Sequence, residues 1–185
     1  MKELSLNILD ITKNSVTAGA DKIEISLTLA ADGWLEFKLT DNGCGMSEEV
    51  CKMVTDPFYT TRTTRKVGMG LPLLKLAAEQ TGGDMTLNSS TDAGNSGTEL
   101  VARFDTNSID FMPIGDIVST VCILISGSPE IRFIFKDKDP RGEVVLDTLE
   151  LKAVLGDEIS LAEPEIVSWI SGYLKEQYEA RENNF

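Results

Sequence analysis

A carboxylate followed by alternating glycines closes a predicted strand in the first half of the chain. The segment DNGCGM at residues 41–46 directly follows the alternating apolar residues of 34–41. At the end of a strand, Asp41 can accept hydrogen bonds from an exocyclic amine such as that of adenine, while glycines let the backbone approach a ligand closely. A tight turn, in which the Asp side chain bonds its own backbone, explains the same residues equally well.

Two polar residues four positions apart lie on a predicted amphipathic helix at residues 3–19. Asp10 and Asn14 therefore share a helix face, about one turn or roughly 6 Å apart. A carboxylate and an amide oxygen in this arrangement can hold Mg²⁺ and order a water molecule. Polar residues on an exposed helix face are commonplace, so this pair by itself does not establish a metal site.

Basic residues gather in the segment TDPFYTTRTTRKVGM at residues 55–69, which contains Arg62, Arg65 and Lys66. This is unexpected in a chain of formal net charge −13, with 30 acidic and 17 basic residues. Connections of this length in compact domains are usually lids or disordered. Arg and Lys supply donors that match a polyphosphate. We interpret the segment as a phosphate-binding flap, with a solvated basic loop as the alternative.

A glycine pair, Gly68 and Gly70, follows this basic segment and opens a predicted helix at residues 70–81. Backbone N–H groups at a helix N-terminus form a favourable site for an anion, and glycines leave them accessible. A lone glycine pair is weak support. Directly after a basic segment, it indicates a phosphate site.

The remaining pattern predicts an α+β protein. Alternation and turn residues predict strands at 22–29, 34–41, 84–90 and 97–104, and a short helix after Ser47. In the second half we expect a helix from Pro113 to Ile125, a strand from Ile131 to Phe135, a capping box at 147–150 before a helix ending at Gly156, and a helix from Pro164. The apolar stripe of the last helix is expected to dock within the protein.

These segments occur in the order of a known set of motifs. The Asn-containing helix, DNGCGM, DPFYTTR, GMGLPLLKLAAEQTGG and GTEL resemble the N, G1, F, G2 and G3 boxes of the GHKL ATPase superfamily, which includes histidine kinases, DNA gyrase, heat-shock chaperones and mismatch-repair ATPases. The resemblance covers nearly all of residues 3–104. It implies a two-layer α/β sandwich (the Bergerat fold) that binds ATP and Mg²⁺ at residues 1–105, followed by a small α+β region at 106–185.

The resemblance also assigns roles to individual residues. It implies that Asn14 is the Mg²⁺ ligand and that Asp41, supported by Thr98, reads adenine. The other positions implied are Gly43, Gly45 and Met46 in the base pocket, Phe58 in the lid, and Gly68, Met69, Gly70 and Leu71 at the phosphates. Arg62, Arg65 and Lys66 are assigned by charge alone.

Two departures from the pattern limit the expected activity. Hydrolysing members place a glutamate where this chain has Asp10, and a misplacement of about 1 Å can cost about a hundredfold in rate, so we expect ATP binding more firmly than turnover. The chain contains no histidine and its first motif begins at once, which argues against a self-contained sensor kinase. We expect a stand-alone regulatory ATPase or protein kinase acting on a partner protein in trans, with partner choice in residues 106–185.

Two other functions fit the same motifs. A non-catalytic ATP/ADP sensor would switch a protein–protein interaction, and Asp10 favours it. An ATP-gated dimerising clamp of the mismatch-repair type, and hence a homodimer, is suggested by NSVTAGA at residues 14–20. The acidic charge argues against a nucleic-acid partner. Apolar runs too short to span a membrane, and the absence of a secretion signal, predict a cytoplasmic protein.

Overall fold

The computed structural model describes residues 3–55, 69–156 and 159–183. The strands are β1 (Lys22–Leu29), β2 (Trp34–Asp41), β3 (Met85–Ser90), β4 (Gly97–Asp105), β5 (Arg132–Asp139) and β6 (Gly142–Asp147). The helices are α1 (Leu4–Thr17), α2 (Glu48–Val54), α3 (Gly70–Gln80), α4 (Ile117–Gly127), α5 (Thr148–Leu155) and α6 (Pro164–Glu182). In this part of the chain, no helix is both long and apolar enough to cross a membrane.

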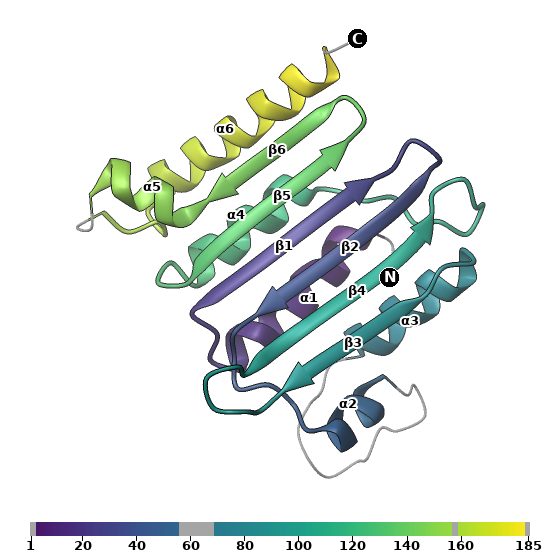
Figure 1. The fold of residues 1–185 in the computed structure, drawn as a ribbon. Coiled ribbons are helices and arrows are strands. Elements are labelled where there is room, and N and C mark those ends of the chain that lie inside the picture. The colour runs from purple at the N-terminus through teal and green to yellow at the C-terminus, as the bar shows by residue number, and fades with distance from the viewer. Residues whose placement is uncertain (1–2, 56–68, 157–158, 184–185) are drawn as a thin grey trace.

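The strands form a single sheet in the order β3-β4-β2-β1-β5-β6. Neighbouring strands pair antiparallel except β1 and β5, which are parallel. Figure 1 shows α1, α3 and α4 behind this sheet. The expected two-layer α/β sandwich with a mixed, largely antiparallel sheet is therefore confirmed. Through β5 and β6, residues from the second half of the chain extend the sheet built by the first half.

The two faces of the sheet follow from strict alternation along the strands. In β1, Ile23, Ile25 and Leu27 are buried, whereas the residues between them face the other side. One side can then pack on helices while the other meets water. The open side carries cross-strand ion pairs, which are Glu24–Lys136, Glu36–Arg103 and Lys38–Glu99.

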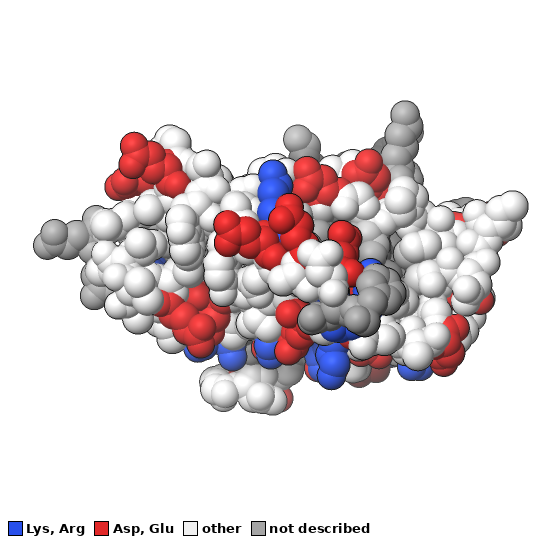
Figure 2. Space-filling model, turned by 90° about the horizontal axis from the view of Figure 1, so that it is seen from above, with Lys and Arg blue, Asp and Glu red and all other residues white. Residues whose placement is uncertain are grey.

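Acidic side chains outnumber basic ones in this protein. The molecule carries 30 Asp and Glu against 17 Lys and Arg. Figure 2 shows several separate clusters of Asp and Glu on a face made mostly of uncharged residues, with fewer Lys and Arg, most of them near its lower edge. Like charges repel each other over a long range at low salt, so an anionic ligand needs local hydrogen-bond donors or cations to bind this protein.

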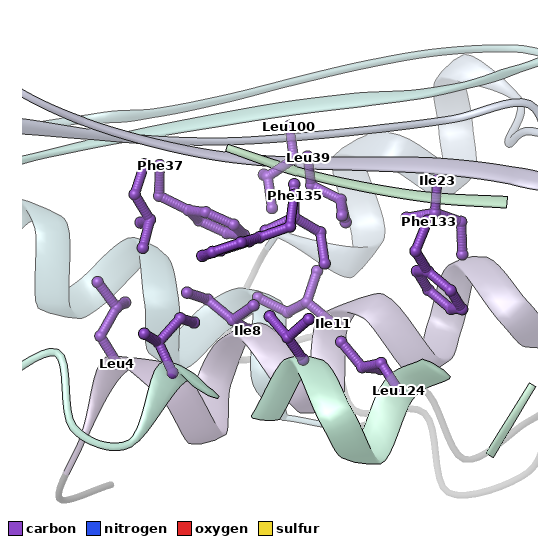
Figure 3. Close-up of a cluster of buried hydrophobic side chains, with 14 of the residues drawn as sticks. Leu4, Ile8, Ile11, Ile23, Phe37, Leu39, Leu100, Leu124, Phe133 and Phe135 are labelled. Carbon is purple, nitrogen blue, oxygen red and sulfur yellow. The ribbon is translucent and has the colours of Figure 1, made fainter. Parts of the chain in front are cut away.

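The core lies between the sheet and the helices. Leu4, Ile8 and Ile11 of α1 recur at helical spacing and are at most 3% exposed. They pack toward Phe37 of β2 and Phe135 of β5 (Figure 3). Since α1 also carries Asp10 and Asn14 on an exposed side, this apolar stripe sets which way those polar residues face.

The expected helix start at Pro113 is wrong. Helix α4 begins at Ile117, after Asp116, whose carboxylate accepts the Ser119 N–H at 2.9 Å. The carbonyls of residues 113 and 114 instead accept the backbone N–H groups of residues 4 and 5 at 2.9 and 2.8 Å. These first N–H groups of α1 lack partners within the helix, and the 113–114 segment supplies them.

The expected strand from Ile131 to Phe135 is too short, and β6 was not predicted. Strand β5 continues to Asp139 because the carboxylates of Asp137 and Asp139 are neutralised inside the fold. Arg181 of α6 bonds Asp137 at 2.9 Å, and its guanidinium lies 3.4 Å from Asp139. An alternating pattern that places carboxylates on the core side resembles a loop when the partner helix is unknown.

The long C-terminal helix docks as expected. Ile170 and Leu174 of α6 are fully buried. On the same helix, the Gln177 side chain accepts the Val145 N–H at 3.1 Å and donates to the Val145 carbonyl at 3.0 Å. Val145 lies on β6, at the edge of the sheet, so Gln177 satisfies backbone groups that an edge strand leaves unpaired.

Candidate nucleotide site

Asp41, the last residue of β2, holds a buried carboxylate at one end of the sheet. The residue as a whole is only 8% exposed. Oδ2 accepts the Ser15 hydroxyl at 2.5 Å, and Oδ1 accepts the Gly43 N–H at 2.9 Å. A carboxylate has about four lone-pair positions, so both oxygens can accept further hydrogen bonds. The group is held in place and still able to read a donor.

Asp41 belongs to a polar row that crosses three strands. Asp41 pairs in register with Thr98 of β4, and Thr98 pairs in register with Ser89 of β3. Directly paired residues project on the same side of a sheet, which here is the helix-covered side. The next row inward is apolar and consists of Leu39, Leu100 and Leu87. The polar row therefore marks the boundary between the core and the candidate site.

The loop after β2 is tied to the end of α1 and the start of β1. The Cys44 N–H donates to the Ala18 carbonyl at 2.9 Å. The Asn42 side-chain oxygen accepts the N–H groups of Asp21 and Lys22 at 3.1 and 2.9 Å. Asn42 thus has a structural role, and the loop is positioned by backbone groups on both sides.

Gly45 lets this loop pack directly on the end of β3. Its φ is +69°, a conformation that favours glycine, and a Cβ placed there would lie 1.8 Å from the Ser90 carbonyl oxygen. The close approach brings the Met46 N–H to 2.8 Å from the Ser89 hydroxyl oxygen. Met46 itself packs against the core. Position 45 therefore requires glycine for two reasons: a side chain would overlap the Ser90 carbonyl, and the positive φ favours glycine.

The first turn of α3 lies beside α1. A Cβ placed on Gly70 would be 3.7 Å from the Asp10 Cβ and 3.4 Å from Ile11 Cγ1. Asp10 and Asn14 are exposed on α1, and Asp10 lies about 7.5 Å from Ser15 along the helix axis, toward the N-terminus. The Asp10 side chain therefore starts next to the first residue of α3, on the same helix whose Ser15 bonds Asp41.

The remaining residues of the glycine motif face different surroundings. Leu71 is 6% exposed and belongs to the core, whereas Met69 is 62% exposed. Phe58, Arg62, Arg65, Lys66 and Gly68 lie outside the residues that the structure describes. The structure brings the residues predicted for the base pocket together at one end of the sheet: Asp41, Gly43, Gly45, Met46 and Thr98. It also places Gly70 of α3 next to Asp10 of α1.

Helix α2 lies beside the edge strand β3 and carries a cysteine. Ser47 caps α2, as expected, by accepting the Val50 N–H at 3.4 Å. A cavity of about 260 Å³ between α2 and β3 is lined in part by Cys51. Burial, and then the charge of Glu48, raises the pKa of the Cys51 thiol. A thiol with a raised pKa is less often present as the nucleophilic thiolate.

Sequence reasoning missed two residues, Ser15 and Ser89. Ser15 follows Leu4, Ile8 and Ile11 on the buried side of α1, where a hydroxyl needs a partner, and the structure supplies Asp41. Ser89 occupies the core-facing register of β3, next to Thr98. In each case the available signal was a serine at a position whose periodicity called for an apolar residue.

A mixed sheet covered by helices on one side, with a buried strand-end aspartate and a glycine loop, defines a class of nucleotide-binding ATPase. The family model of the histidine kinase-, DNA gyrase B- and HSP90-like ATPases matches residues 1–108. This is more than half of the chain. The chain belongs to this family.

Curated relatives include two histidine kinases. The chain is 32% identical over 88 residues to the sensor histidine kinase GlnK of Bacillus subtilis, covering 44% of this chain and 22% of that protein. It is 32% identical over 89 residues to the signal transduction histidine-protein kinase AtoS of Escherichia coli, covering 48% and 14%. The chain therefore spans about a fifth or less of the length of these relatives.

Solved structures show the same fold over a larger part of the chain. The N-terminal domain of a DNA repair protein superposes with a TM-score of 0.57 and 16% identity, covering 80% of this chain and 53% of that one. The Aquifex aeolicus MutL ATPase domain, a complex with ADP, superposes with a TM-score of 0.53 and 18% identity, covering 80% and 63%. At these identities the likeness is one of fold.

Proposed function

We propose that this protein binds Mg-ATP at the Asp41 end of the sheet and acts on a partner protein in trans, as a regulatory ATPase or protein kinase. The observation that carries the proposal is the Asp41 carboxylate, which is buried, held by Ser15 and Gly43, and still has lone pairs to offer. Membership of an ATPase family supports the nucleotide. The base would lie against Asp41, Gly45 and Met46.

The phosphates would extend along α1 toward α3. The start of α3 at Gly70 offers backbone N–H groups and a positive helix end, both of which suit an anion. Asn14 would hold Mg²⁺ through its amide oxygen, an oxygen ligand of the kind that Mg²⁺ prefers. When bound, the ion supplies neutralisation of phosphate charge. Asn14 is exposed on α1 and available for this contact.

Asp10 is the candidate general base. It is exposed on α1 and lies next to Gly70, where the terminal phosphate would end. In hydrolysis its carboxylate would accept a proton from the attacking water. In phosphoryl transfer to a protein, the acceptor side chain would come from the partner. The 185 residues contain no histidine, so a histidine acceptor would have to lie outside them.

Calorimetry of ATP, ADP and a non-hydrolysable analogue with Mg²⁺ tests the binding proposal. Asp41→Asn should weaken ATP binding by about ten- to a hundredfold, because the amide N–H₂ can present a donor to the exocyclic amine of the base and the carboxylate charge is lost. The matched control is Asp110→Asn, which changes the same charge at an exposed position. If Asp41→Asn bound ATP like the wild type, the proposed base contact would be refuted.

A second candidate is a non-catalytic ATP sensor, favoured by Asp10 itself. Its side chain is one methylene shorter than glutamate, and reach decides whether a base contacts its water. Turnover of labelled ATP by wild type and Asp10→Glu, with equal binding in calorimetry, separates the two functions. A catalytic protein should turn over ATP in the wild type and lose this turnover in Asp10→Asn. A sensor would bind ATP without turning it over in either protein.

A further inference from the structure

The Ser89 hydroxyl is the meeting point of three hydrogen-bond partners at the base end of the site. The Met46 N–H lies 2.8 Å from Ser89 Oγ. The Gly97 carbonyl oxygen also lies at 2.8 Å. The Thr98 hydroxyl oxygen is the third neighbour, again at 2.8 Å. Ser89 therefore joins the glycine loop after β2 to the start of β4.

The direction of each of these hydrogen bonds follows from what the partners can do. A serine hydroxyl has one proton and two lone pairs. A backbone N–H can only donate, so the Met46 N–H occupies one lone pair of the Ser89 oxygen. A carbonyl can only accept, so the Ser89 hydroxyl donates its hydrogen bond to the Gly97 carbonyl. The second lone pair of Ser89 is left for Thr98. The Thr98 hydroxyl therefore donates its proton to Ser89.

This assignment changes what the site can read. With its proton directed at Ser89, the Thr98 oxygen presents only lone pairs on its other side. Its register partner Asp41 is also an acceptor, and the donors next to it, Ser15 and Gly43, already point at its oxygens. The side chains that border the base position are thus acceptors on two adjacent strands.

We propose that Ser89 is a positioning residue that sets base selectivity by holding Thr98 as an acceptor. This inference rests on the proposed function. An edge made of acceptors suits a purine with an exocyclic amine, as in ATP. It opposes a purine with an oxo group at that position, as in ITP, because acceptor then faces acceptor. The Ser89 hydroxyl is already engaged by Met46, Gly97 and Thr98, so Ser89 would act on the base of ATP or ITP through Thr98.

The test is the ratio of ITP to ATP dissociation constants, measured by calorimetry with Mg²⁺. In Ser89→Ala the Thr98 hydroxyl is released and can donate to the oxo group. ITP should then bind more tightly in absolute terms, and the preference for ATP should fall by about tenfold. A residue with only a structural role would weaken both nucleotides equally and leave the ratio unchanged, which would overturn the inference.

Three further variants make the outcome specific. Ser89→Thr keeps the hydroxyl and should retain the wild-type ratio. Ser90→Ala is the matched control, since its hydroxyl accepts the Asp92 N–H and lies one residue along the same strand. In a Thr98→Val background, Ser89→Ala should leave the ratio unaltered, because the group through which it acts is gone. A further change of the ratio in that background would contradict the mechanism.

The two proposals fail in different ways. If the wild type binds neither ATP nor ITP, the proposed function is refuted before Ser89 is tested. If the wild type binds ATP, and Asp41→Asn weakens that binding while Ser89→Ala leaves the ratio intact, only the role of Ser89 is refuted. A melting curve for each variant establishes that the comparison is made between folded proteins.

Discussion

Asp41 and Thr98 face each other in register across β2 and β4, on the side of the sheet that the helices cover. One residue ends a strand and the other lies near the start of the neighbouring strand, so antiparallel pairing brings together positions that are distant in the sequence. Beyond them the sheet face is apolar. The pair therefore places polar side chains at the end of the apolar face of the sheet, and a mostly apolar surface with a few polar groups is typical of sites for small ligands.

Ser15 should be required for nucleotide binding although it lies on the buried side of α1. Its hydroxyl donates to Asp41 Oδ2 at 2.5 Å, and the residue is 4% exposed. Ser15→Ala should weaken ATP binding about tenfold, because the Asp41 carboxylate loses a donor that orients it. Thr17→Ala removes an exposed hydroxyl that donates to the Lys13 carbonyl within the helix, and it should leave affinity unchanged. Calorimetry of both variants decides, and equal affinities would contradict the prediction.

Alanine substitutions at Gly45 and Gly94 distinguish the cost of backbone strain from the cost of a steric overlap. Both have positive φ, +69° and +89°. A Cβ at Gly94 would meet none of the described residues within 4 Å, whereas one at Gly45 would overlap the Ser90 carbonyl. Gly94→Ala should cost about 1 kcal/mol in free energy of unfolding. Gly45→Ala should cost more and also abolish ATP binding, because the loop must move away from β3. Urea denaturation and calorimetry measure the two effects; equal behaviour would refute the contact.

The ion pair between Arg132 and Asp147 predicts a pH-dependent contribution to stability. Arg132 donates to both Asp147 oxygens at 3.1 and 2.7 Å, and it holds the pKa of Asp147 below its ordinary value of 3.8. A lowered carboxyl pKa stabilises the fold above the ordinary value, and this stabilisation is lost as pH falls through the lower, folded value. Asp147→Asn, which keeps the cap on α5, should therefore lose about 1 kcal/mol at neutral pH. The difference from wild type should shrink below pH 3.8.

Glu99→Gln is the control for this experiment. Its ion pair with Lys38 joins two side chains that are each 40% exposed, whereas Asp147 is 11% exposed. An exposed pair contributes little because water screens it. Denaturant titrations from pH 2.5 to 7 should therefore give a smaller change for Glu99→Gln. A difference for Asp147→Asn that did not vary with pH would mean that the lost charge is not its cause.

Arg181 should stabilise the whole sheet from the far end of the chain. It bonds the backbone and carboxylate of Asp137 at 3.0 and 2.9 Å, lies near Asp139, and stacks over Tyr178. Arg181→Met removes one member of a buried charge network and should cost about 3 kcal/mol. Since β5 pairs with β1, unfolding should remain a single cooperative transition. Two separate transitions in calorimetry would instead support independent units at residues 1–105 and 106–185.

The first half of the fold was accessible from the sequence because its signals are local. The strands at 22–29 and 34–41 alternate over their whole length, and α1 repeats its apolar residues at helical spacing. The second half was predicted less well. Its β6 was missed and α4 was started too early, because Asp137, Asp139 and residues 113–114 are explained only by partners far away in the chain.

The sequence by itself determined the family, the order of the elements in the first half of the chain and the identity of the motif residues, because periodicity and glycine placement act over a few neighbouring residues. Tertiary structure decided which side chains meet. The partners of Asp41 come from α1 and β4, and the Ser89 contacts come from the loop after β2 and from β4. Such contacts depend on strand register and on helix docking, and both are set by burial of the shared core. Whether a given serine bonds a carboxylate or faces water is therefore decided only once the sheet and helices have packed together.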